Sequence, residues 1–368
     1  MIKPITYKLR ALLLLSLPVL AFNLNAQFVQ DTSKKVQYLA VPVLFKTPEF
    51  GFAYGLSGSI SFKTSHKRDS LTRTSVIQTI SFFTTRKQNV QAIDAVIYFP
   101  KENYILLTQI SHNYFPDKFW GIGPKTKDNP FEKYTYEHLY FNPHIKKRLS
   151  NRIFAGLLYE FQNVFWINHK DSGLFALSDF YGKEKYKVSG LGLSLSYDSR
   201  NNTFWPEKGF FLLTQLTNFN KKLLSDFDVL KWTSDLRYFQ KIRKGHILAF
   251  QLYNYRTYGQ TPIRDLGALG GPNNLRGFYQ GRYRAKSMFS FITEYRVQLY
   301  KRFSACFFGG LGTVYTVRSE LNEKNLKYSY GGGLRFALLE KEKLHIRLDY
   351  GYSNKFNSGF YFTIGECF

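Results

Sequence analysis

The stretch GLGLSLSY, residues 190–197, alternates small or polar residues with large apolar ones. Because successive side chains of an extended strand point to opposite faces, Leu191, Leu193 and Leu195 share one face, and the glycines and serines share the other. A helical period does not fit this spacing. The segment therefore predicts a β-strand with one apolar face and one small, polar face.

The same period of two recurs on both sides of this segment. In residues 285–299, aromatic and aliphatic side chains oppose Glu294 and Arg296, and in residues 343–354 they oppose Asp349. A soluble β-sandwich also alternates, but its strands more often have about five or six residues. These segments run to about ten residues or more with charges in mid-strand on one face, which favours a membrane barrel with a polar interior.

Sixteen candidate strands follow one another from residue 36 onward. An even number lets both ends of a bacterial barrel meet on the periplasmic side, with long loops outside and tight turns in the periplasm. The fold class is therefore predicted as all-β, a transmembrane antiparallel barrel of sixteen strands that occupies residues 27–368. The predicted strands span residues 36–47, 50–63, 72–85, 87–99, 103–115, 134–146, 151–164, 187–199, 209–219, 230–241, 245–258, 285–299, 303–316, 327–339, 343–354 and 358–367.

The composition agrees with a barrel. Aromatic residues make up 18% of the chain, more than a soluble core uses, and two aromatic girdles at the membrane interfaces would account for them. The mean hydropathy is below zero. No window after the first residues is continuously apolar for the roughly eighteen residues that a helical span needs, so any span must be made of strands.

Residues 1–26 have the three-part layout of a secretory signal. Basic residues precede an apolar run from Ala11 to Phe22, and a short polar stretch ends at Ala26. We expect cleavage before Gln27; an uncleaved anchor is the alternative, although a spanning helix needs roughly twenty apolar residues. We expect no folded periplasmic module between the signal and the first predicted strand, because few residues separate them.

The formal net charge is +25. On an exported protein, so basic a surface attracts the phosphates of outer-membrane lipids or anionic solutes in a lumen, and export argues against nucleic acid. Solvated loop charge that aids solubility is the alternative. The two cysteines, Cys306 and Cys367, are too few for a disulfide framework or a metal site. We therefore expect free thiols in strands, no metal and no cofactor.

The break before the twelfth predicted strand contains GGPNNLRGFYQGRYR, residues 270–284. Its glycines allow a long loop to bend tightly back into the lumen. An arginine carried there needs an acid, because an unpaired buried charge is costly. Glu294, which the alternation points inward, is the expected partner of Arg276. The alternative is a solvated Arg276 that touches lipid phosphates.

Within this loop, Leu275, Arg276, Gly277 and Phe278 form an LRGF motif that resembles the sixth-loop signature of the BamA/TamA superfamily, also called the bacterial surface antigen family. Five predicted strands follow the motif, as they do in that family. The resemblance covers the barrel from end to end and implies an outer-membrane barrel whose loop arginine contacts an acid on the inner wall. Four further stretches agree in order, namely TPEFGFAYG (47–55), FWGIG (119–123), YDSRNNTFWPEKG (197–209) and EYR (294–296).

One position departs from the family pattern. The thirteenth strand of the family usually carries an aspartate in an F-x-D-x-G pattern. The matching stretch here is FGGLG, residues 308–312, with Gly310 at the position of the acid. We therefore expect the loop arginine to be held by one acid rather than two.

The last stretch, GFYFTIGECF, is predicted to place Phe360, Phe362, Ile364 and Phe368 on one face of the final strand. It resembles the carboxy-terminal signal by which the barrel-assembly machinery recognises outer-membrane barrels for insertion. An aromatic last residue also suits an aromatic girdle. Both interpretations place Phe368 in the membrane.

Two functions fit these features. The first is assembly or transport of protein or lipid at the outer membrane. Relatives that handle proteins receive their clients on periplasmic repeats. We expect no such repeats here, and therefore a separate periplasmic or lipoprotein partner. The second is a pore or diffusion channel, because a barrel of this size can leave an aqueous channel, although an infolded loop would plug it. Its cationic lumen would be lined by Arg237, Arg296, Arg335 and Arg347.

An enzymatic role is not expected. A nucleophile needs a base and an orienting acid within reach, and the seven histidines are scattered along the chain with no serine or acid at telling spacing. The sequence contains no GxSxG, HExxH or phosphate-cradling glycine loop.

Overall fold

The computed structural model describes residues 36–65, 72–339, 343–353 and 357–368. The signal sequence predicted for residues 1–26 lies outside these ranges, so its cleavage stays a prediction. None of the described helices is long and apolar enough to cross a membrane.

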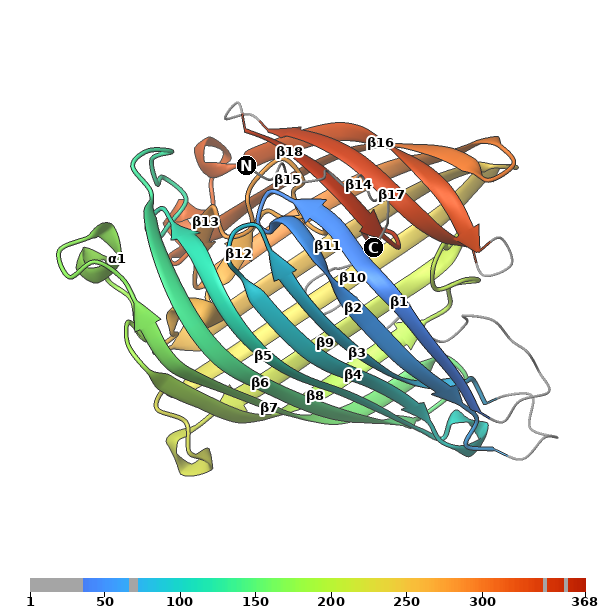
Figure 1. Cartoon of the computed structure of the whole chain (residues 1–368), viewed down its shortest axis with the longest axis horizontal. Helices are drawn as coiled ribbons and strands as arrows, with labels where there is room; N and C mark the ends of the chain where they lie inside the picture. Colours follow the sequence, from blue (N-terminus) through green and yellow to red (C-terminus); the bar gives the residue numbers. More distant parts are fainter. Residues whose placement is uncertain (1–35, 66–71, 340–342, 354–356) are drawn as a thin grey trace, which may run out of the picture.

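Sixteen strands of the described chain close into one antiparallel barrel (Figure 1), which confirms the predicted fold class. Neighbours in the sequence are neighbours in the barrel, except that β11 pairs with β14 because β12 and β13 form a separate ribbon. The barrel strands are β1 (Val36–Thr47), β2 (Gly51–Phe62), β3 (Ser75–Thr84), β4 (Asn89–Tyr98), β5 (Tyr104–Phe119), β6 (Glu132–Arg148), β7 (Ile153–Asn168), β8 (Tyr186–Asp198), β9 (Gly209–Phe219), β10 (Val229–Arg243), β11 (His246–Gly259), β14 (Ser287–Tyr300), β15 (Phe303–Tyr315), β16 (Lys327–Leu339), β17 (Leu344–Ser353) and β18 (Ser358–Ile364).

The remaining elements lie in the connections. The ribbon consists of β12 (Gly267–Leu269) and β13 (Tyr283–Ala285). The helices are short, and they are η2 (Pro100–Glu102), α1 (Leu174–Leu177), η3 (Lys221–Leu223), η4 (Ile263–Asp265), η5 (Arg318–Glu320) and η6 (Glu323–Asn325).

The alternation of side chains decides which face of each strand meets the outside. On β8, Leu193 is 62% exposed on the outer face, whereas Ser194 and Ser196 are buried inside. On β14 and β17 the acids Glu294 and Asp349 point inward and are buried. An apolar exterior and a polar interior are the arrangement that a membrane barrel requires.

The predicted strands differ from the observed ones mainly at the end of the barrel that carries the long loops. The ladder of β5 and β6 continues to the pair Phe119↔Glu132, beyond the predicted strand end at residue 115. The predicted strand 285–299 instead begins at Ser287, because Ala285 belongs to the ribbon that leads out of the preceding loop.

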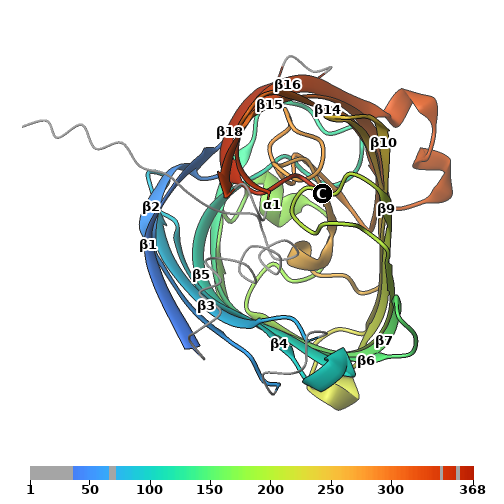
Figure 2. The same ribbon diagram turned by 90° about the vertical axis from the view of Figure 1, so that its right-hand side faces the viewer.

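The ladder between the first and last strands is much shorter than the others. β1 pairs with β2 in register from Val36 to Thr47. Against β18, the described part of the chain shows a single registered pair, Lys46↔Phe362. Figure 2, which looks into the barrel, shows β1 and β18 as the two sides of this seam.

Candidate functional site: an arginine-locked loop in the lumen

The connection between β11 and β14 folds back into the barrel (Figure 2). Its residues Leu275, Arg276 and Phe278 are fully buried. Gly277 has a left-handed φ of 108°, and a Cβ atom there would lie 2.9 Å from the backbone of Tyr352 on β17. A glycine is needed here because the loop backbone lies directly against the barrel wall.

Arg276 forms ion pairs with two buried carboxylates. Its Nη2 donates to Glu294 on β14, and its Nη1 donates to Asp349 on β17 at 2.6 Å. The guanidinium carbon also lies 3.5 Å from the centre of the Phe308 ring on β15. The structure therefore places the expected acid, Glu294, in contact with Arg276 and adds a second one.

The expectation of a single acid was wrong. The second carboxylate comes from β17 rather than from β15, where Gly310 replaces the acid of the family pattern. A Cβ atom on Gly310 would lie 3.1 Å from Leu275 Cδ2, and one on Gly312 would lie 2.8 Å from Leu275 Cδ1. The two glycines leave room for the Leu275 side chain against the wall of the barrel. The second carboxylate that binds Arg276 therefore comes from another strand.

Further arginines join the same buried network. Arg296 lies 2.8 Å from Glu294, and Arg335 lies 2.5 Å from Asp349 and 2.9 Å from Glu366. Neither arginine side chain is exposed to solvent. Buried charges of this kind are tolerable because each faces opposite charges at hydrogen-bond distance, and removal of one leaves its partners uncompensated.

A tyrosine of β18 also holds the loop. The backbone N–H of Gly277 donates to the Tyr361 hydroxyl at 2.9 Å, and that hydroxyl lies 3.4 Å from the Phe278 carbonyl oxygen. The loop is therefore fixed to β14 and β17 and also to β18, one of the two strands at the seam.

The other side of the loop is attached to β5 and to the β1–β2 turn. The Tyr279 hydroxyl donates to Asp117 on β5 at 2.9 Å, and Arg284 donates to the other oxygen of Asp117 at 2.9 Å. The backbone N–H of Gln280 donates at 2.8 Å to Glu49, in the β1–β2 turn, and burial raises the pKa of the Glu49 carboxyl. Because β5 and β14 lie on nearly opposite sides of the ring, the loop bridges the lumen.

The residues of the predicted insertion signal do not all share one face. Phe360 is 44% exposed on the outer face, and Phe362 is paired there with Lys46. Ile364 is buried, and β18 ends at this residue. Gly365 then turns with a positive φ, so that Phe368 points inward.

The prediction that Phe368 shares a face with Phe360 and lies in the membrane was therefore wrong. Its ring is 3% exposed and packs with Phe239, Ala249 and Ile292 inside the barrel. Its backbone oxygen accepts a hydrogen bond from Arg296 at 3.1 Å. The role of this stretch as an insertion signal stays a prediction.

The four arginines of the predicted cationic lumen point inward but face acids or acceptors. Arg237 lies 2.5 Å from Asp235 on its own strand, and Arg296 and Arg335 belong to the network around Arg276. Arg347 lies 3.4 Å from Asp349 and donates to the carbonyl oxygen of Pro272 in the loop. These arginines therefore form ion pairs and hydrogen bonds within the barrel wall and with the loop.

One histidine has a partner that its position in the sequence does not suggest. His144 Nε2 on β6 lies 2.6 Å from Ser194 Oγ on β8, across Gly156 on β7, where a Cβ atom would lie 2.6 Å from both. No carboxylate of the described residues lies against His144 as an orienting acid. Among the same residues no group of three or more His, Cys, Asp or Glu is placed to hold a metal ion, so we assign no metal ligand.

The site residues that sequence reasoning missed are Asp349, Tyr361 and Glu366. Asp349 and Tyr361 occupy inward positions of their strands, so the alternation marks them as lumen residues. It does not tell which lumen residue the loop will meet, because contacts between distant strands depend on the stagger of the closed barrel.

A closed sixteen-stranded barrel, apolar outside and bridged inside by an arginine-locked loop, defines the class of outer-membrane β-barrels. The family model described as "Omp85 superfamily domain" matches residues 47–368. The chain therefore belongs to the Omp85 superfamily, and the resemblance to BamA-like barrels is confirmed.

Solved structures agree in fold, with this chain covered to 90% in each case. BamA from Haemophilus ducreyi lacking POTRA domains 1–3 has 11% identity and a TM-score of 0.59, with 70% of that chain covered. CdiB from Acinetobacter baumannii has 12% identity and a TM-score of 0.60, and CdiB from Escherichia coli has 10% and 0.58. The chain spans 60% and 63% of these two CdiB chains. No curated protein sequence matches the chain.

The ion pairs of Arg276 with Glu294 and Asp349 predict that mutations at these positions have non-additive effects on stability. Arg276→Ala and Glu294→Ala should each lower the free energy of unfolding by about 3–5 kcal/mol, because each leaves a buried charge uncompensated. The double variant should lose less than the sum, by about 0.5–3 kcal/mol. Urea unfolding of the detergent-solubilised barrel measures all four proteins, and strictly additive losses would show that the two side chains do not interact.

The close approach of the loop to β17 predicts a steric effect at Gly351. A Cβ atom there would lie 2.7 Å from the carbonyl carbon of Arg276, so Gly351→Ala should displace the loop and cost roughly 1–3 kcal/mol. Trypsin should then cut at Arg282 and Arg284, which are buried in the wild type.

The control is Gly332→Ala on β16, where the nearest atom is 3.5 Å away. This variant should resist trypsin as the wild type does. Equal resistance of both variants would contradict the tight seating of the loop.

Proposed function

We propose that this chain is an integral protein of the bacterial outer membrane that acts in the assembly or transport of protein or lipid. In this proposal the seam between β1 and β18 is the place where the barrel wall opens toward a client. Outer-membrane lipids surround the barrel, and a periplasmic protein or lipoprotein delivers the client.

The observation that carries the proposal is the short ladder at the seam. Within the described part of the chain, residues 38–45 of β1 have no registered partner on β18, whereas the same residues are paired throughout on the β2 side. A strand edge with unpaired N–H and C=O groups is a template for another strand, and such groups are costly next to lipid. The seam is therefore the weakest part of the wall and the part most able to accept an incoming chain.

The attachment of the loop to β18 supports the proposal that the seam opens. Tyr361, which binds the loop backbone at Gly277, stands on β18 directly before Phe362, the residue that pairs with β1. A movement of the loop would therefore reach the seam through two adjacent residues of one strand.

The pore alternative has less support. The loop bridges the lumen from β14 to β5, and the arginines that would make the lumen cationic face acids or loop acceptors. We also infer a non-enzymatic role, because Ser194 and His144 have no orienting carboxylate among the described residues.

A disulfide across the seam tests the proposal. Lys46→Cys with Phe362→Cys joins the registered pair that the described residues show between β1 and β18. Tyr38→Cys with Ile60→Cys joins a registered pair of the continuous β1–β2 ladder as a matched control. Each variant replaces the wild type in a strain of the source bacterium that lacks the chromosomal copy, and the outer-membrane protein and lipid profiles are compared with and without reductant.

We expect the deletion to disturb one of these profiles. The seam disulfide should disturb the same profile until it is reduced, and the control disulfide should not. Normal profiles in the deletion strain, or full activity of the oxidised seam variant, would contradict the proposal.

A further inference from the structure

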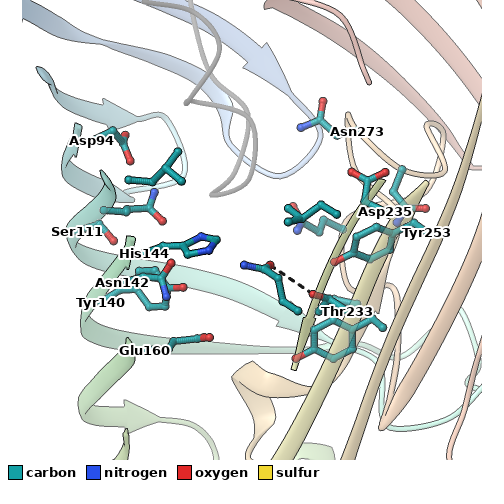
Figure 3. A pocket seen from close by; sticks show the side chains of 18 of the residues that line it. Asp94, Ser111, Tyr140, Asn142, His144, Glu160, Thr233, Asp235, Tyr253 and Asn273 are labelled. Atoms are coloured by element: carbon teal, nitrogen blue, oxygen red, sulfur yellow. Dashed lines mark hydrogen bonds between the residues drawn. The ribbon is translucent and has the colours of Figure 1, made fainter. Parts of the chain in front are cut away.

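A cavity of about 660 Å³ lies in the lumen beneath the loop (Figure 3). Its volume falls in the range of about 300–1,000 Å³ that is usual for small-molecule sites. The side chains of Pro272, Asn273 and Asn274 from the loop line it together with the barrel walls. The locked loop thus provides one boundary of a chamber rather than filling the whole lumen.

The lining of the chamber combines apolar and charged side chains with many uncharged hydrogen-bonding groups and tyrosines. One wall, from β5 and β6, presents Gln109, Ser111 and Asn142, and the wall across from it, from β10 and β11, presents Thr233 and Tyr253. Figure 3 shows several of these side chains pointing toward one another across the open space. Amides, hydroxyls and tyrosine rings are suited to a ligand that offers many hydroxyl groups and a flat apolar face.

The charges in the chamber are mostly paired with one another. Glu160 on β7 makes an ion pair with Lys231, and Asp235 makes one with Arg237. These pairs neutralise both carboxylates, so they give little reason for a charged ligand.

Asp94 on β4 is one of two lining carboxylates for which the described residues show no ion pair; the other, Glu49, accepts a hydrogen bond from the backbone of Gln280. Asp94 is 6% exposed and lines the chamber. Its Oδ1 has no hydrogen-bond partner within the described residues, and none of the ion pairs found there involves it. Buried polar atoms are rarely left unsatisfied, so this oxygen marks a place where a ligand or a water supplies a donor. The loop residue Asn274 likewise has an unsatisfied buried Oδ1.

We propose that this chamber binds a saccharide of one or two rings. Its hydroxyl groups would donate to Asp94 Oδ1 and to the amide oxygens of the walls, and a sugar face would stack on Tyr140 or Tyr253. A hydroxyl that donates to a carboxylate forms the stronger, charge-assisted kind of hydrogen bond, so Asp94 anchors the ligand. The proposal does not depend on the seam or on any client.

Binding is tested on the purified, detergent-solubilised chain with maltose, cellobiose and di-N-acetylchitobiose as probes. Isothermal titration gives Kd, and saturation-transfer NMR shows which sugar protons contact the protein. Spermidine, which offers amines without hydroxyls, serves as the competing ligand class. Heat-modifiable migration on a gel checks that every variant is a folded barrel.

We expect at least one saccharide to bind with millimolar or tighter Kd. Asp94→Asn should weaken that binding about tenfold or more, since a hydrogen bond to a charged acceptor is lost. Tyr253→Phe should weaken it less. The matched control Asp171→Asn, at an exposed loop position, should leave Kd unchanged.

Three results would overturn the proposal. They are the absence of saccharide binding to the folded wild type, an unchanged Kd in Asp94→Asn, and binding of spermidine without binding of any saccharide. The first would mean that water alone satisfies the chamber, and the last would assign it to cations.

Discussion

The rest of the structure depends on the burial of one guanidinium between two carboxylates. Arg276 has no exposed side-chain surface, and it reaches Glu294 and Asp349 on two non-adjacent strands. A charge buried in this way is stable only while both acids remain in place. The loop that carries Arg276 must therefore stay inside the barrel, and the strands that carry the acids must keep their stagger.

The position of the loop determines the shape of the interior. On one side its backbone rests on β17 and β18, and on the other Tyr279 and Arg284 share Asp117. The loop thereby lines one side of a chamber of about 660 Å³ in the lumen. The hydrogen bond between Gly277 and Tyr361 joins the loop to β18. Among the described residues, the ladder of β18 with β1 is the shortest in the barrel. A displacement of the loop can therefore reach the seam through β18.

The sequence alone was sufficient to predict the barrel and the contact between Arg276 and Glu294. A period of two gives the inner and outer faces of each strand, so the strand number and the inward position of Glu294 could be predicted. Asp349 was not predicted as a partner, although its inward position was, because a contact between distant strands depends on the stagger of the closed barrel. Phe368 was misplaced because Gly365 ends the alternation with a positive φ, which a period of two cannot anticipate.

The central claim is that Arg276 holds the loop across the lumen. Pulsed electron-spin distance measurements test it most directly, with labels at Gln280→Cys on the loop and Leu321→Cys on the exposed β15–β16 connection; the native Cys306 and Cys367 are buried. With Arg276 intact we predict one narrow distance distribution, and with Arg276→Ala a broad and shifted one. A broad distribution in the intact protein, or the same narrow distribution in both, would contradict the account.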